Sequence, residues 1–318
     1  MGPIPSVGLL EEHTQTIIKD HSEEKFIVLV VGTRIVEEFY EREKIWLNQH
    51  CIANQFIRPQ TMQKLCSLQG VKCNFLIEIS KKIGIKTFRL LPPKNLDNVA
   101  FLCLSDIKSG IEKLFGILVS YSSETAREKE EKLYIYKDIP FDSSKSKIWF
   151  NEKEAIVKLG EKILTLGLPT DFSMDIILTK EWKEDNLEEL LNILRRNGAA
   201  INSVYYISSR TSRFISKHLF EQNVQGYPIV SFGTSGFIFP VKKMRIYHTL
   251  FPLYIHLYYP DRNLEKDDFF KILWLVKRRI YRIQELEVIK LPEPMYILSG
   301  VRKLWLPKIE ATLEIPLR

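Results

Sequence analysis

The chain has 318 residues, and 46 Lys and Arg against 39 Asp and Glu give it a formal net charge of +7. Hydrophobic residues make up 45% and charged residues 27% of the sequence, which is ordinary for a globular protein and excludes a largely disordered chain. The 14 Gly and 15 Pro show no period, which excludes a collagen-like structure. This length predicts one large domain or two smaller ones.

Membrane insertion and a secretory route are not expected. No apolar run reaches the roughly 18–20 residues that a bilayer span needs. Residues 1–20 lack a basic start followed by an apolar stretch, so no signal peptide is indicated. The four cysteines form no CxxC pair, which favours neither a zinc site nor a disulfide scaffold. We therefore expect a reducing, cytoplasmic location.

Positive charge gathers in the last quarter of the sequence. Residues 240–318 hold 15 Lys and Arg against 9 Asp and Glu. From charge alone two interpretations stay open: a solvated surface, or a surface that binds a polyanion such as nucleic acid.

The first elements have an α/β pattern. Residues 1–24 are polar and mixed, typical of a loop or a short helix. The apolar run Phe26–Val31 ends at a glycine and predicts a strand buried on both faces. A helical period follows over Thr33–Gln49. A second strand and turn are predicted over residues 50–60. A strand, a glycine and a helix in this order open an α/β layer.

Two further predicted helices and a chain break complete the first part. Thr61 is predicted to cap a short helix. The spacing of apolar residues over Asn74–Lys82 predicts another helix, and a strand over Val71–Ile79 is the alternative. The residues Pro92-Pro93-Lys94-Asn95 break the chain, so we place a domain boundary near them.

The second part begins with strands and then alternates strands with helices, which predicts a mixed sheet with helices on its faces. Strands are predicted over Val99–Ser105, Leu114–Ser120, Leu133–Tyr136, Met174–Leu178, Ser203–Ile207 and Pro252–Tyr258, a hairpin over Gly226–Pro240, and helices over Glu152–Leu166, Leu187–Arg196 and Asp268–Ile283.

Four polar residues of the first part could bind a phosphate. Tyr40 and Lys44 are four residues apart on the predicted first helix and so lie one turn apart. Gln55 follows the next turn, and Lys82 ends a later helix that carries Glu78 one turn earlier. A phenol, an amide and two ammonium groups are suitable donors to a phosphate. The spacing alone is more typical of a solvated helix face than of a phosphate site.

Several runs resemble a known family. Tyr40-Glu-Arg-Glu-Lys44, Ala53-Asn-Gln55-Phe-Ile and Ser80-Lys-Lys82-Ile-Gly84 together resemble the guide-anchoring motif of Argonaute MID domains. The second half resembles the PIWI domain at Gly233-Thr234, at Pro252-Leu-Tyr-Ile-His-Leu257 and at Leu291-Pro-Glu-Pro-Met-Tyr296. The resemblance covers roughly residues 25–318, and the order of the motifs carries it.

The resemblance implies an α/β architecture in which a Rossmann-like MID domain precedes an RNase H-like PIWI domain. The implied domains are an N-terminal extension (1–24), MID (25–95) and PIWI (96–318). Tyr40, Lys44, Gln55 and Lys82 would hold the 5′ phosphate of a guide strand. In some relatives the C-terminal carboxylate also bridges a divalent cation there. One Mg²⁺ held by Glu78 and the carboxylate of Arg318 is the corresponding expectation.

The sequence departs from the family at the catalytic acids. Active PIWI domains hold two metal ions with four acidic or His side chains, because hard cations prefer oxygen ligands. Asp106 falls at the end of the predicted first PIWI strand. After the strand of residues 175–178, the run Thr179-Lys180-Glu181 offers only Glu181 as an acid, and residues 296–305 contain no acid or His. We therefore expect no catalytic residues and no slicing. A metal-dependent, RNase H-type guided nuclease using Asp106 and Glu181 is the alternative.

The resemblance also implies partners. The chain lacks the N and PAZ domains of long Argonautes and is similar to short, inactive prokaryotic members of the family. Such proteins act as heterodimers with a partner that supplies the missing region, and with an effector, in defence against invading DNA. The guide is expected to be RNA and the target single-stranded DNA. A structural subunit that makes only protein contacts is a further hypothesis. The candidate contacts to the guide or target backbone are Lys277, Arg278, Arg279, Arg282, Arg302 and Lys303.

Overall fold

The structure is a computed structural model of the whole chain, and it describes the residues that follow. They are residues 16, 27–31, 46–47, 53–82, 96–109, 112–122, 131–144, 146–168, 170–209, 223–224, 226–239, 252–277, 291–301 and 313–317. Within these ranges some side chains, including those of residues 78, 80–82 and 313–317, are outside the description. The chain forms two compact units, one mainly of residues 1–89 and the other mainly of residues 90–303 and 308–317.

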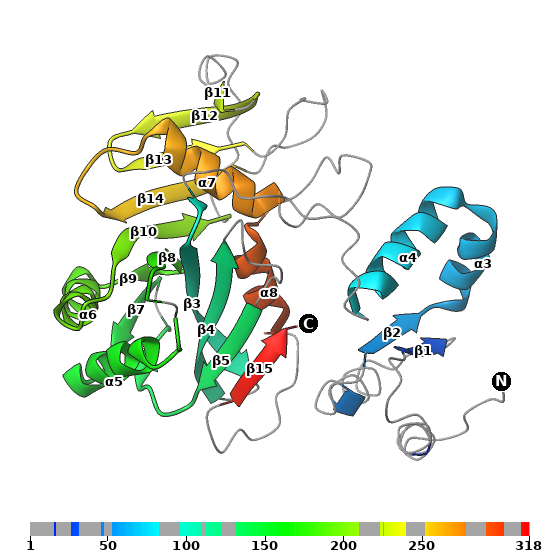
Figure 1. The fold of residues 1–318 in the computed structure, drawn as a ribbon, viewed down its shortest axis with the longest axis horizontal. Coiled ribbons are helices and arrows are strands. Elements are labelled where there is room, and N and C mark those ends of the chain that lie inside the picture. Colours follow the sequence, from blue (N-terminus) through cyan, green and yellow to red (C-terminus); the bar gives the residue numbers. More distant parts are fainter. Residues whose placement is uncertain are drawn as a thin grey trace. The chain divides into compact units, whose positions relative to one another are not determined.

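The smaller unit contains a parallel pair of strands followed by two helices (Figure 1). Strands β1 (Ile27–Val31) and β2 (Ala53–Ile57) pair in parallel, which requires a crossover between them. Leu47, helical within that crossover, is fully buried and packs against apolar side chains of both strands. Helices α3 (Pro59–Ser67) and α4 (Gln69–Lys82) follow. The two strands and the helix over Asn74–Lys82 are confirmed, and the strand alternative is wrong.

Two local expectations for this unit are wrong. Leu29 and Val31 are 38% and 48% exposed, so β1 is not buried on both faces. Thr61 does not cap α3, because the helix begins at Pro59 with Arg58 at its N-cap. Proline favours the first helical position because its fixed φ suits the helix and its missing N–H would be unpaired there anyway.

The larger unit is built on one sheet of ten strands in the order β11-β12-β13-β14-β10-β8-β3-β4-β5-β15 (Figure 1). A separate small sheet pairs β6 (Phe141–Asp142), β7 (Lys147–Phe150) and β9 (Glu181–Trp182). The bounds of the ten strands are β3 (Val99–Ser109), β4 (Glu112–Ser122), β5 (Glu131–Tyr136), β8 (Ser173–Leu178), β10 (Ile201–Ser208), β11 (Asn223–Val224), β12 (Tyr227–Phe232), β13 (Ser235–Ile238), β14 (Leu253–Tyr259) and β15 (Leu313–Leu317).

The strand directions confirm the mixed sheet expected from the sequence. Strands β3, β4 and β5 form an antiparallel meander. Strand β8 then pairs in parallel with β3, and β10 pairs in parallel with β8. The helices that join these parallel strands are α5 (Lys153–Leu164) and α6 (Glu184–Arg196). Beyond β10 the sheet continues antiparallel through β14, β13 and β12.

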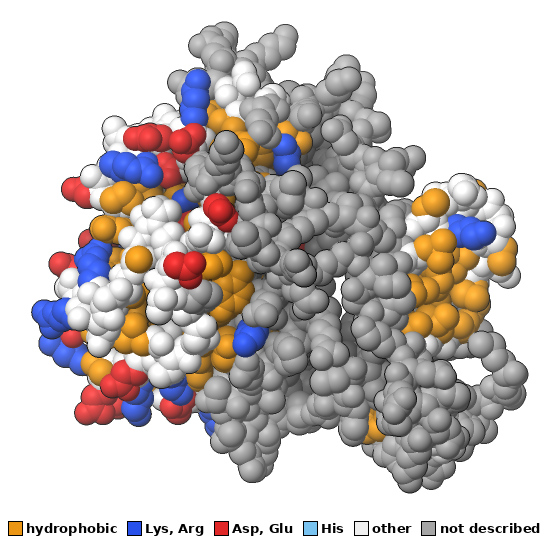
Figure 2. Space-filling model, in the orientation of Figure 1, with side chains coloured by type: hydrophobic (Ala, Val, Ile, Leu, Met, Phe, Trp, Pro, Cys, Tyr) orange, Lys and Arg blue, Asp and Glu red, His pale blue; other side chains and the backbone are white. Residues whose placement is uncertain are grey.

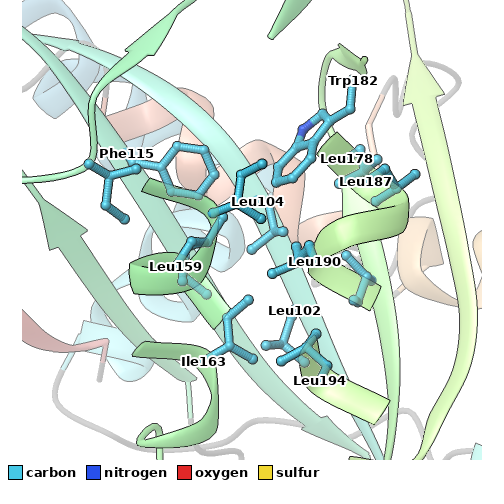
Figure 3. Close-up of a cluster of buried hydrophobic side chains, with 14 of the residues drawn as sticks. Leu102, Leu104, Phe115, Leu159, Ile163, Leu178, Trp182, Leu187, Leu190 and Leu194 are labelled. Atoms are coloured by element: carbon cyan, nitrogen blue, oxygen red, sulfur yellow. The ribbon is translucent and has the colours of Figure 1, made fainter. Parts of the chain in front are cut away.

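Helices α5 and α6 cover one face of the central strands and bury the main core (Figure 3). Apolar residues recur every three or four positions in both helices, so each presents one apolar face to the sheet. The buried residues of this core include Leu102 and Leu104 of β3, Leu159 and Ile163 of α5, and Leu190 and Leu194 of α6.

Helices α7 (Lys266–Lys277) and α8 (Glu293–Val301) belong to the same unit. The ring centroids of Phe101 in β3 and Trp274 in α7 lie 6.0 Å apart. Helix α8 contacts β3, β4 and α7. Helix α7 begins two residues before the predicted position, and the rest of the predicted helix lies outside the described residues. No helix in the described ranges is long and apolar enough to cross a membrane.

Candidate functional site

The expected guide-phosphate residues fall mostly outside the description. Tyr40 and Lys44 lie outside the described residues. Gln55 lies in the middle of β2, half-buried, and its side-chain amide donates to the Phe56 carbonyl at 3.1 Å. Lys82 is the last residue of α4, one turn after Glu78, and neither side chain is described. The phosphate site formed by the four residues, and the Mg²⁺ expected beside it at Glu78 and Arg318, stay predictions.

A polar cluster lies where β3 and β8 run side by side. Leu104 pairs with Leu178, so the next residues, Ser105 and Thr179, are neighbours. The Thr179 hydroxyl donates to the Ser105 hydroxyl at 2.7 Å. We call Ser105, Asp106, Thr179, Lys180 and Glu181 the strand-end cluster. Its centre is a pair of hydroxyls, one from β3 and one from the residue that directly follows β8.

The two carboxylates of the strand-end cluster each face a lysine. Asp106 lies 3.4 Å from the Lys180 ammonium, which also donates to the Ser143 carbonyl at 2.8 Å. Glu181 lies 4.0 Å from the Lys147 ammonium. Strand β3 continues to Ser109, so Asp106 lies inside the strand and not at its end as expected. Its neighbour Ser105 points to the opposite face of the sheet.

This arrangement differs from a carboxylate metal site. A two-metal centre needs carboxylate oxygens that converge on the cations. In the strand-end cluster, one ammonium lies 3.4 Å from Asp106 and another lies 4.0 Å from the partly exposed Glu181. Within the described part of the chain, no group of three or more His, Cys, Asp or Glu side chains could hold a metal ion.

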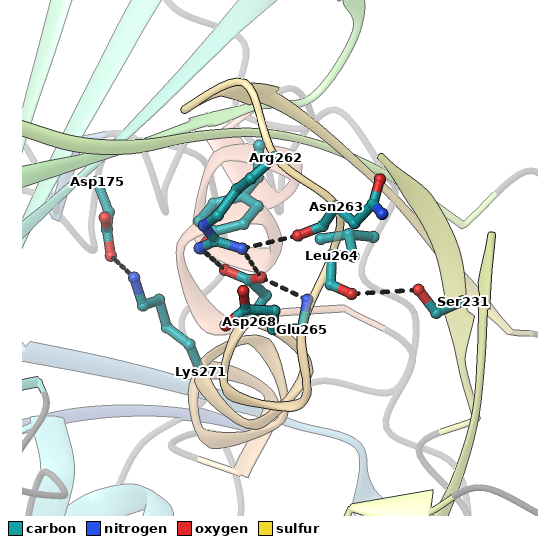
Figure 4. A network of polar contacts seen from close by, with 9 residues as sticks. Asp175, Ser231, Arg262, Asn263, Leu264, Glu265, Asp268 and Lys271 are labelled. Atoms are coloured by element: carbon teal, nitrogen blue, oxygen red, sulfur yellow. Dashed lines mark hydrogen bonds and ion pairs between the residues drawn. The ribbon is translucent and has the colours of Figure 1, made fainter. Parts of the chain in front are cut away.

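A buried ionic network joins the sheet to α7 (Figure 4). Asp175 of β8 is fully buried, forms an ion pair with Lys271 of α7 at 2.8 Å, and accepts a hydrogen bond from Asn202 at 3.0 Å. Burial raises the pKa of Asp175, and the attraction of Lys271 only partly opposes it. This pair could not be predicted from the sequence, because a single acid in an apolar strand does not identify a partner 96 residues later.

Asp268 of α7 is the second centre of the network (Figure 4). The Arg262 guanidinium donates to both of its oxygens, at 2.6 and 2.9 Å. The Tyr205 hydroxyl donates to it at 2.6 Å, and the Glu265 backbone N–H at 2.9 Å. The last bond is half of a capping box, in which a side chain in the first turn satisfies a backbone donor at the helix start. The network therefore fixes the start of α7 on β10.

Only one of the expected backbone contacts is described. Lys277 ends α7, and its ammonium lies 4.9 Å from the centroid of the Tyr227 ring. Across the described surface of the larger unit, Figure 2 shows basic and acidic side chains interspersed. The other expected contacts, Arg278, Arg279, Arg282, Arg302 and Lys303, lie outside the described residues.

Comparison with solved structures identifies the fold. The chain aligns over 98% of its length with a crystal structure of A. aeolicus Argonaute, at a TM-score of 0.60 and 18% identity. It aligns over 93% of its length with Clostridium butyricum Argonaute bound to a guide DNA and a 19-mer target DNA, at a TM-score of 0.61 and 15% identity. The chain spans only 43% and 40% of those two proteins. No protein-family model and no curated protein matches it. The MID–PIWI architecture expected from the sequence is confirmed as a fold.

Proposed function

We propose that this protein recognises nucleic acid through a bound guide strand. One observation carries the proposal: almost the whole chain adopts the fold of two Argonaute structures, one of them bound to guide and target DNA. In such a system base pairing reads the sequence, while the protein holds the backbone and reads its shape. The sequence pI of about 9.0 favours a polyanionic ligand.

The guide is held by its 5′ phosphate in this proposal. Tyr40, Lys44, Gln55 and Lys82 are the donors, and one Mg²⁺ at Glu78 and the Arg318 carboxylate completes the site. Charge-assisted hydrogen bonds to a phosphate are roughly twice as strong as neutral ones. Most of the 5′-end affinity should therefore come from the two lysines.

The test compares guides that differ only at the 5′ end. The full chain should bind a 5′-phosphorylated 20-mer much more tightly than its 5′-hydroxyl form, with RNA and DNA guides measured separately by fluorescence anisotropy. Lys44→Glu and Lys82→Glu should abolish the preference, because each replaces an ammonium by a carboxylate. Lys113→Glu, at an exposed position of β4, is the matched charge control and should keep it. Equal affinities for the two 5′ ends would contradict the proposal.

We also propose that the protein does not cut its target. Support comes from the strand-end cluster, where two hydroxyls are paired and each carboxylate faces a lysine. Loaded with guide and incubated with a complementary target and Mn²⁺, the protein should leave the target intact. Guide-directed cleavage at one position would favour the alternative, a metal-dependent nuclease of RNase H type.

The resemblance to short Argonautes also suggests partners. We propose that a partner protein forms a heterodimer with this chain and supplies a region equivalent to N and PAZ. An RNA guide, a single-stranded DNA target and an effector that responds to target binding in defence complete the proposal. Purification from the native host without any co-purifying nucleic acid would favour the purely structural subunit.

A further inference from the structure

Lys180 of the strand-end cluster lies between two oxygen groups that come from different elements. Its ammonium is 3.4 Å from Oδ2 of Asp106 on β3, and it donates to the Ser143 carbonyl, just after β6, at 2.8 Å. The Asp106 side chain is only 3% exposed, whereas that of Lys180 is 21% exposed. One positive charge therefore joins a buried carboxylate and a backbone carbonyl, and one side of it remains open to solvent.

The register of the sheet explains why Asp106 and Lys180 meet. Strands β3 and β8 are parallel, and Leu104 pairs with Leu178. Two residues further along each chain, Asp106 comes opposite Lys180. Since side chains alternate between faces, both lie on the face of Leu104 and Leu178, which belong to the main core. The hydroxyl pair of the cluster points to the opposite face, so the ion pair forms a site of its own.

The segment after β6 supplies the second oxygen group. The Ser144 backbone N–H donates to the Asp142 side chain at 2.8 Å, which closes a tight turn around Ser143. Ser143 itself is buried. Within the described part of the chain, its hydroxyl has no hydrogen-bond partner, which is unusual for a buried polar atom. The residue that presents a carbonyl to the ammonium therefore buries a further oxygen.

These donors suit a metal ion, but the structure places a lysine among them. Carboxylate and carbonyl oxygens are the ligands that hard divalent cations prefer. A cation bound to Asp106 would lie close to the Lys180 ammonium, and like charges repel strongly at such distances. The site therefore does not fit the metal that an active PIWI domain would hold there.

We propose that Lys180 is a tethered cation that takes the place of a divalent metal ion at Asp106. The inference rests on the proposed absence of cleavage and deepens it, because it assigns the exclusion of metal to a residue that is present. An ammonium on a side chain neutralises the carboxylate without dissociating. Removing it would leave a buried charge without its counter-ion, which is strongly destabilising. A divalent cation from solution could then enter from the open side and restore the stability, because it binds only the folded chain.

The test is rescue of stability by Mn²⁺ alone, in the full chain without a guide. Thermal unfolding is followed by circular dichroism in EDTA and in millimolar Mn²⁺. In EDTA, Lys180→Met should lower Tm by about 5 °C or more. Mn²⁺ should recover at least half of this loss and should raise the Tm of the parent much less. Lys180→Arg, which keeps a positive charge, should respond to Mn²⁺ as the parent does.

Lys113→Met is the matched control. Lys113 lies 3.6 Å from Asp142, and these two side chains are 40% and 44% exposed. Its loss leaves a hydrated carboxylate, so the variant should gain no Mn²⁺ response. Asp106→Asn combined with Lys180→Met removes both buried charges and should gain none either. Titration calorimetry with Mn²⁺ should find one more bound ion in Lys180→Met than in the parent.

Three results would overturn the proposal. One is a Lys180→Met protein that matches the parent in both EDTA and Mn²⁺. Another is an equal Mn²⁺ gain in Lys113→Met or in the double variant, because the gain would then not depend on the Asp106 carboxylate. The third is a Lys180→Met protein that stays unfolded in Mn²⁺ while the double variant folds. None of these measurements includes a guide or a target, so guide-directed cleavage by the parent would separately contradict the proposed function.

Discussion

Asp268 makes more polar contacts than any other carboxylate described above, and these contacts make folding depend on pH. Burial acts to raise the pKa of Asp268, but hydrogen bonds from Arg262, the Glu265 backbone and Tyr205 outweigh it, and the pKa lies below its usual value. The unfolded chain has the ordinary value of about 3.9. The carboxylate therefore stabilises the fold above that pH, and this stabilisation disappears as the pH falls through the lower folded-state value.

We predict that Asp268→Asn lowers the free energy of unfolding at pH 7 by about 1–3 kcal/mol, because Arg262 and Tyr205 lose a charged acceptor. The variant should also lose less stability than the parent between pH 5 and pH 3. Urea unfolding followed by circular dichroism at pH 7, 5 and 3 measures both effects. Asp185→Asn is the control, since Asp185 pairs with Lys183 where its side chain is 81% exposed, and surface pairs contribute little. Identical pH dependence of Asp268→Asn and the parent would contradict the assignment.

At the scale of elements, α7 packs closely on β13 because Gly236 has no side chain. A Cβ atom at Gly236 would lie 2.5 Å from the Val230 carbonyl oxygen and 2.7 Å from Cζ of Phe269 on α7. This carbonyl belongs to the neighbouring strand β12 and cannot move without disturbing the hydrogen bonds between β12 and β13. We predict that Gly236→Ala destabilises the protein by about 1–3 kcal/mol.

Chemical denaturation measures the stability of Gly236→Ala, and a control substitution is made at a glycine that has free space around it. No atom lies within 4 Å of a Cβ added at Gly70 of α4. Gly70→Ala should be neutral or stabilising by about 0.5–1 kcal/mol, because alanine favours a helix. A Gly236→Ala protein as stable as the parent would mean that α7 sits farther from the sheet.

The longer elements could be predicted from the sequence because their apolar period is sustained. The meander β3–β4–β5 and helices α5 and α6 belong to this class. Strands β6, β7, β9 and β11 are two to four residues long and too short to show a period. Helix α8 was missed because apolar residues dominate it on all sides, so no amphipathic stripe marks it. In β1 the composition of the run suggested two buried faces, whereas packing leaves Leu29 exposed.

At the scale of the whole molecule, the two units differ in whether their site residues could be predicted from the sequence. Motif order pointed to Tyr40, Lys44, Gln55 and Lys82, and of these only the Gln55 side chain is described. The Asp175–Lys271 pair was not predicted. Its members lie on β8 and α7, far apart in sequence, and only the packing of α7 against the sheet brings them together. Charge distribution left two interpretations open, a solvated surface and a polyanion-binding surface, and it identified no particular surface.

The pairing of β15 with β5 has a consequence for biosynthesis. These strands are neighbours at one edge of the sheet, yet about 180 residues separate them along the chain. A ribosome adding 5–20 residues per second would need roughly 10–35 s between completing one and the other. During that interval the outer edge of β5 has no native neighbour to occupy its backbone N–H and C=O groups. Slow translation would lengthen this window for mispairing, and chaperones that shield nascent strands should improve the yield of native protein.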